Sequence, residues 1–157
     1  MPTVAKWYVN ARVPVSKAPS SIPSISRRKR VLVVDDEPGA IPLLRKLLSR
    51  HEVVTTESAE VAVRLLDLGR FDIVIVDNWT RQLSGLELLS YVSARHPRTR
   101  RILHSAQEPG TFRNLQDMGV VEFYVAKPGY FMLERLCDGF GVRRRVTQRY
   151  AVAGQPA

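Results

Sequence analysis

The chain has 157 residues, of which 45% are hydrophobic, and it carries a formal net charge of +9. This length supports one buried core of ordinary size and hardly two. The single cysteine, Cys137, excludes an internal disulfide and a multi-cysteine zinc site, and no apolar run approaches the roughly 18 residues of a membrane span. We therefore expect a cytoplasmic protein with no membrane partner, in which Cys137 packs within a helix.

The excess positive charge lies outside the central part of the chain. Residues 1–30 hold seven basic residues and no acid, residues 143–157 hold four arginines, and residues 31–142 hold 13 basic and 15 acidic residues, a formal charge of −2. The first 29 residues are also rich in proline and serine and have no regular period. We expect a disordered basic extension over 1–29 and a flexible basic tail over 143–157.

Two functions of the tails stay open as alternatives. An organellar transit peptide has the same basic, serine-rich composition, but four prolines oppose the amphipathic helix that such peptides form. Binding of nucleic acid through the tails is the other alternative, because clustered positive charge attracts phosphate.

From residue 30 onward, strand and helix patterns alternate. Five such βα units predict right-handed crossovers and one parallel sheet with helices on both faces. The expected strands are 31–35, 52–56, 71–77, 101–105 and 123–127, and the expected helices are about 39–50, 58–69, 85–97, 111–118 and 131–140.

Carboxylates follow the first and third of these strands. Asp35 and Asp36 come directly after the aliphatic run 31–34, and Asp77 comes directly after the aliphatic run 73–76. Strands of this composition are buried on both faces of a parallel sheet, and the carboxyl ends of neighbouring strands meet at one edge. If these two strands are neighbours, three carboxylates converge on one site. Such a cluster requires a cation, and hard oxygen ligands suit Mg²⁺.

Simpler interpretations exist for several polar residues. The acidic pair is compatible with a solvated loop, and Lys127 with a surface charge at a strand end. The three histidines share no metal-ligand spacing, and we expect His104 to be a peripheral strand residue. A haloacid-dehalogenase-like phosphatase requires Asp-x-Asp after its first strand, which residues 35–37 do not supply.

Polar motifs also close the fourth and fifth expected strands. They are Ser105-Ala106 and Lys127-Pro128, with Tyr124 three residues before the lysine and Gly85 eight residues after Asp77. Together with the aspartates, this order resembles the receiver domain of two-component response regulators, of the stand-alone type. The resemblance covers about residues 29–141. It implies a flavodoxin-like, doubly wound α/β domain over 30–142, with a five-stranded parallel sheet of order 2-1-3-4-5.

The resemblance also implies roles for individual residues. Asp77 would be the phosphoacceptor, with Lys127 meeting first its carboxylate and then the phosphoryl oxygens. Ser105 would donate a hydrogen bond to the phosphoryl group and, together with Tyr124, form the switch. Mg²⁺ would be held by Asp36 and Asp77 directly, by Asp35 mostly through water, and by the main-chain carbonyl of Trp79.

Partners follow from the same resemblance. The phosphoryl donor would be a phosphohistidine on a sensor histidine kinase or a histidine phosphotransfer protein. Enzymatic activity would be limited to self-phosphorylation and self-dephosphorylation. The output would be binding to a downstream protein by a monomer or a phosphorylation-dependent dimer, since no second globular domain is expected after residue 142. A phosphorylation-independent interaction module with the same fold is the alternative.

Two positions depart from the family pattern. Many receivers have Met-Pro where this chain has Thr80-Arg81, and an aromatic residue directly after Lys-Pro where this chain has Gly129. Neither position carries a group expected to react. The family also implies a cis bond between Lys127 and Pro128.

Overall fold

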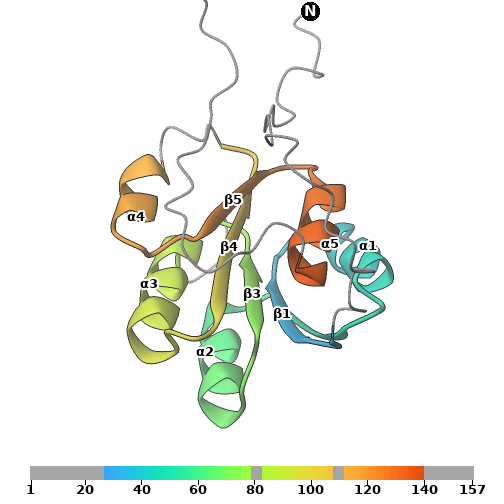
Figure 1. Ribbon diagram of the computed structural model, residues 1–157, viewed down its shortest axis with the longest axis horizontal. Coiled ribbons are helices and arrows are strands. Elements are labelled where there is room, and N and C mark those ends of the chain that lie inside the picture. The colour runs from blue at the N-terminus through green and yellow to red at the C-terminus, as the bar shows by residue number, and fades with distance from the viewer. Residues whose placement is uncertain (1–26, 79–82, 108–111, 140–157) are drawn as a thin grey trace, which may run out of the picture. The chain divides into compact units, whose positions relative to one another are not determined.

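The computed structural model describes residues 27–78, 83–107 and 112–139, so residues 1–26 of the N-terminal extension and the whole C-terminal tail lie outside the described residues (Figure 1). All five strands pair in parallel, in the order β2-β1-β3-β4-β5. This order confirms the flavodoxin-like, doubly wound α/β fold. The elements are β1 (Arg30–Val34), α1 (Ala40–Leu47), β2 (Glu52–Thr56), α2 (Ala59–Leu68), β3 (Ile73–Val76), α3 (Gly85–Arg95), β4 (Arg100–Ser105), α4 (Arg113–Asp117), β5 (Phe123–Ala126) and α5 (Tyr130–Asp138).

The sheet separates two hydrophobic cores. Figure 1 shows α1 and α5 on one face of the sheet and α2, α3 and α4 on the other. Along β1, Val31 and Val33 join the core under α1 and α5, whereas Leu32 and Val34 join the core under α2 and α3. Since both faces are covered, consecutive side chains of β1 and β3 are buried, which explains the continuous aliphatic runs 31–34 and 73–76.

Local sequence signals set several helix ends. The Ser58 side chain accepts a hydrogen bond from the backbone of Val61 and caps α2. Ser84 and Glu87 form a reciprocal capping box at the start of α3, which satisfies two backbone donors that have no partner within the helix. Gly139 ends α5 with a φ of 88°, a conformation that glycine adopts without steric cost.

The weakest helix is shorter than its pattern predicts. The expected helix over 111–118 is observed as α4, Arg113–Asp117, and residue 111 lies outside the described residues. No side chain caps its first turn, and none of its five residues is buried. The buried side chain of Phe112 precedes α4 and holds this end of the segment against the core.

Two further observations concern composition. Cys137 is fully buried within α5, as expected, and burial raises the pKa of its thiol to about 12. Among the described residues, no helix combines the length and apolar character needed to cross a membrane.

Candidate functional site

The carboxylates after β1 and β3 meet at one edge of the sheet. These strands are neighbours, with Val34 paired to Val76, so the residues that follow them are brought together. One side-chain oxygen from each of Asp35, Asp36 and Asp77 lies within 4.8 Å of the others. Asp35 and Asp77 are buried and Asp36 is half-buried. The site is therefore a partly enclosed carboxylate cluster.

Lys127 reaches this cluster from the end of β5. Its Nζ lies 2.9 Å from Oδ2 of Asp77, 3.2 Å from Oδ2 of Asp35 and 3.0 Å from Oε2 of Glu37. Burial opposes the charge on the ammonium, but the hydrogen bonds to Asp77 and Glu37 and the charges of the aspartates outweigh it and raise the pKa of Lys127. The lysine is therefore held in its charged form.

Glu37 is a member of the site that sequence reasoning missed. It is exposed, and its carboxylate shares the Lys127 ammonium with the two buried aspartates. Its place directly after the acidic pair was the available signal. A glutamate side chain is long enough to reach across from the β1–α1 loop to the end of β5.

Asp35 has one satisfied and one unsatisfied oxygen. Its Oδ1 accepts a hydrogen bond of 2.9 Å from the backbone of Glu37. Its Oδ2 is buried and forms an ion pair with Lys127 Nζ at 3.2 Å, but has no hydrogen-bond partner within the described residues. Burial raises the pKa of this carboxyl, against the effect of the Glu37 hydrogen bond and the Lys127 charge. A buried carboxylate oxygen without a hydrogen bond, beside two other carboxylates, fits a hard divalent cation.

The fourth and fifth strands bring Ser105 and Tyr124 together. Ser105 is fully buried, and its Oγ accepts a hydrogen bond of 3.2 Å from the backbone of Gln107. The Tyr124 hydroxyl donates to the carbonyl oxygens of Ser105, at 3.0 Å, and of Gln107. Its ring stacks on Phe112 at 5.4 Å between centroids and is only 9% exposed. Tyr124 therefore points inward, toward Ser105 and the loop that follows β4.

A side-chain hydrogen bond joins the two loops beside the site. The Asn78 amide donates to Oε1 of Gln107 at 3.0 Å, which links the residue after Asp77 to the loop that follows β4. Sequence reasoning did not identify Asn78. Trp79, proposed as a ligand through its carbonyl, lies outside the described residues.

The prediction that His104 is a peripheral strand residue is wrong. His104 is fully buried, since β4 is an inner strand covered on both faces. Its Nε2 lies 3.3 Å from the carbonyl oxygen of Pro128, and its ring meets the edge of Tyr130 at 5.4 Å. Because a carbonyl only accepts, Nε2 carries the proton, and within the described residues Nδ1 is buried without a partner. Burial, followed by the nearby Lys127 charge, lowers the pKa of His104 to about 4.

Two backbone features follow the end of β5. The bond between Lys127 and Pro128 is cis, as the family resemblance implies. Gly129 is the position where the family often has an aromatic residue. A Cβ atom on Gly129 would lie 2.4 Å from the backbone oxygen of Ala126, so this backbone conformation accommodates only glycine.

Comparison with known proteins agrees with this arrangement. The response regulator receiver domain family matches residues 31–138. Response regulator protein PilR of Pseudomonas aeruginosa is 38% identical over 74 residues, which are 46% of this chain and 17% of PilR. The chain thus spans less than a fifth of the length of the curated relatives it matches.

Solved structures show the same fold. The response regulator protein TrrA of Thermotoga maritima, in complex with Mg²⁺–BeF, is 30% identical with a TM-score of 0.63, and the match covers 71% of this chain and 98% of TrrA. The receiver domain of the Francisella response regulator 1452 is 18% identical with a TM-score of 0.66, covering 72% of this chain and 96% of that domain. By its family match over residues 31–138 and the fold it shares with these proteins, the chain belongs to the response regulator receiver domain family.

Proposed function

We propose that this chain accepts a phosphoryl group on Asp77 from a phosphohistidine donor and thereby switches a protein-binding surface. One observation carries the proposal. The Lys127 ammonium lies 2.9 Å from the Asp77 carboxylate, at the edge of the sheet where three aspartate oxygens gather within 4.8 Å. A carboxylate there can accept an anionic group only if positive charge offsets the repulsion, and Lys127 supplies such charge.

In the phosphoryl transfer step, one bond to phosphorus forms as another breaks, and residues of the site stabilise the charges. A carboxylate oxygen of Asp77 attacks phosphorus, the P–O bond forms, and the P–N bond to the donor imidazole breaks. The electron pair of that bond stays on the imidazole nitrogen, which takes up a proton. Lys127 then shares its charge between Asp77 and the phosphoryl oxygens. Ser105, whose Oγ already accepts from the Gln107 backbone, keeps its own proton to donate to the phosphoryl group.

The carboxylate cluster fits Mg²⁺ as a cofactor. Asp35, Asp36 and Asp77 would hold the ion, and the buried Asp35 oxygen without a hydrogen bond supports this assignment. When bound, Mg²⁺ would neutralise the charge on the transferring phosphoryl oxygens. The Mg²⁺–BeF complex of TrrA, which shares 30% of its residues with this chain, is a further support.

The donor and the output follow from membership of the family. A sensor histidine kinase or a histidine phosphotransfer protein would supply the phosphoryl group. The surface of α4, β5 and α5 would bind the downstream protein, because Tyr124 on β5 contacts Ser105 directly. Met118 and Phe131 are exposed apolar residues after α4 and on α5, respectively, and suit such a contact.

Acetyl phosphate labelling tests the proposal. The full chain, incubated with acetyl phosphate and Mg²⁺, should gain the mass of one phosphoryl group, and chelation of Mg²⁺ should abolish the gain. Asp77→Asn should not be labelled. Asp72→Asn is the matched control, because Asp72 precedes the same strand at its other end, and it should be labelled like the wild type. Absence of labelling in the wild type would reject the proposal and favour a phosphorylation-independent module.

A further inference from the structure

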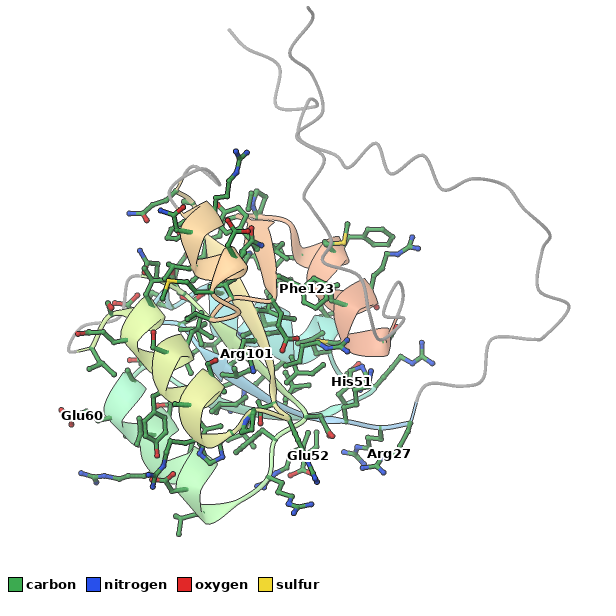
Figure 2. All side chains as sticks on the ribbon, turned by 60° about the vertical axis from the view of Figure 1, so that its left-hand side comes forward. Arg27, His51, Glu52, Glu60, Arg101 and Phe123 are labelled. Atoms are coloured by element: carbon green, nitrogen blue, oxygen red, sulfur yellow. The ribbon has the colours of Figure 1, made fainter. Side chains whose placement is uncertain are left out.

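A basic concavity lies at the edge of the sheet opposite the carboxylates. It is formed by residues at and before the amino-terminal ends of β1, β2 and β3, whereas Asp35 and Asp77 follow the carboxyl ends. Figure 2 shows Arg27 and Glu52 at this end of the domain. The concavity has a volume of about 500 Å³ and only charged side chains line it: Arg27, Arg28, Lys29, Arg30, Glu52, Arg70 and Asp72.

Both acids of the basic concavity already have a partner. Glu52 accepts a hydrogen bond from Arg30 Nε at 3.0 Å, and Asp72 accepts one from the Arg30 backbone at 2.8 Å. The Arg30 guanidinium also lies over the ring of Phe71, 4.5 Å from its centroid. Arg30 is therefore held in place, and it neutralises the carboxylate of Glu52.

Three arginines of the basic concavity remain uncompensated. Arg27, Arg28 and Arg70 are exposed, and within the described residues their guanidinium groups make no hydrogen bond and no ion pair. Each guanidinium offers several donors in a planar fork, so together they can hold several anionic oxygens at once.

The chain enters and leaves the described domain at the edge that holds the basic concavity. Lys29 Nζ donates to the carbonyl oxygen of Cys137, and burial followed by the charge of Arg100 lowers the pKa of Lys29. A Cβ atom on Gly139 would lie 3.4 Å from Lys29 Nζ, so the two ends of the described domain lie at the same edge. The segments attached there, 1–26 and 140–157, add three and four basic residues and no acid.

We propose that the basic concavity binds the phosphate backbone of a nucleic acid. A nucleic acid is a long, regularly spaced polyanion, and its affinity for a protein depends on the number of phosphates that basic side chains neutralise. Arginine is the residue best matched to phosphate, through two parallel hydrogen bonds, and 19 of the 24 basic residues are arginine. A wholly charged lining favours this partner over a membrane surface, where apolar side chains enter the lipid.

This proposal is independent of phosphoryl transfer to Asp77. It also differs from nucleic-acid binding by the tails alone. It places the contact on the folded domain, at the edge away from Asp77. Asp77→Asn should therefore bind nucleic acid as the wild type does, so that a failure of one proposal leaves the other intact.

Fluorescence anisotropy with a short labelled duplex DNA tests the proposal on the full chain. The variant with Arg27→Gln, Arg28→Gln and Arg70→Gln should bind at least about tenfold more weakly at physiological ionic strength. Its plot of log K against log salt should lose about two to three units of slope, since each phosphate contact contributes about 0.9. The matched control carries Lys46→Gln, Arg64→Gln and Arg113→Gln on α1, α2 and α4, which removes the same charge elsewhere. Its affinity should change less than about twofold.

Several results would overturn the proposal. Equal losses in the two triple variants would show that only net charge matters, and an unchanged affinity in the Arg27, Arg28 and Arg70 variant would place binding elsewhere. Tighter binding to vesicles of anionic phospholipid or to polyglutamate than to duplex DNA, at the same ionic strength, would assign the basic concavity to another partner. No binding of the wild type would also reject it.

Discussion

Gly85 packs so closely on Asp77 that a Cβ atom at this glycine would lie 2.2 Å from the Asp77 backbone oxygen. The amino terminus of α3 therefore rests directly on the end of β3. This contact explains why a glycine stands eight residues after the candidate phosphoacceptor, since any side chain would push the helix away from the strand.

Gly85→Ala should destabilise the domain by about 1–3 kcal/mol, because an added methyl group would have to displace backbone. It should also slow acetyl phosphate labelling by shifting Asp77. Gly39→Ala is the matched control, since no atom lies within 4 Å of a Cβ there. Urea unfolding and intact mass measure the two effects. Equal stability of the two variants would contradict the close contact.

Lys127→Gln should have opposite effects on Mg²⁺ binding and on phosphoryl transfer. Removing the ammonium leaves a more negative carboxylate cluster, so Mg²⁺ affinity measured by calorimetry should rise about five- to tenfold, on the order of 1 kcal/mol. Labelling of Asp77 should slow, because the charge that offsets the incoming phosphoryl group is gone. Lys46→Gln, on the exposed face of α1, should change neither quantity. A Lys127→Gln variant that binds Mg²⁺ more weakly would argue against this electrostatic account.

His104 should make the domain sensitive to mild acid. Its folded-state pKa, about 4, lies below the ordinary value of 6.5, so the unfolded chain binds the proton more tightly. Stability should therefore be complete above about pH 6.5 and fall as the pH drops toward 4, by at most on the order of 3 kcal/mol.

His104→Gln tests this pH dependence, because glutamine keeps a donor for Pro128 but does not titrate. Urea midpoints measured from about pH 7.5 to about pH 4.5 should fall less steeply for this variant than for the wild type. Parallel curves for wild type and His104→Gln would assign the acid sensitivity to other groups.

Tyr124→Phe should cost about 1 kcal/mol of stability, because the carbonyl oxygens of the buried Ser105 and the half-buried Gln107 lose a donor. The ring should stay buried, since its stacking on Phe112 is unchanged. The control is Tyr91→Phe, whose hydroxyl bonds the exposed Asp67 and should cost less than about 0.5 kcal/mol. Urea unfolding compares them, and similar losses would mean that the Tyr124 hydroxyl bonds contribute little.

The sequence predicted the fold and the convergence of the three aspartates, because its strand-end motifs resemble a family in which the first and third strands are neighbours. Aliphatic runs mark the strands, and right-handed crossovers between parallel strands leave few possible orders. Once β1 and β3 are neighbours, the residues that follow them must share an edge. Asp35, Asp36 and Asp77 could therefore be placed together from local pattern and connectivity.

Other features of the site could not be predicted from the sequence, because they are contacts between residues that are distant in the chain. The Glu37 contact with Lys127, the burial of His104 against Pro128 and the Asn78–Gln107 hydrogen bond each join different loops or strands. No local period encodes these contacts, because they depend on side-chain reach and on how loops pack. The basic concavity is visible in the sequence only in part. Arg27, Arg28, Lys29 and Arg30 are consecutive, but Arg70 lies 40 residues after Arg30, and the parallel sheet brings it beside them by aligning the starts of β1 and β3.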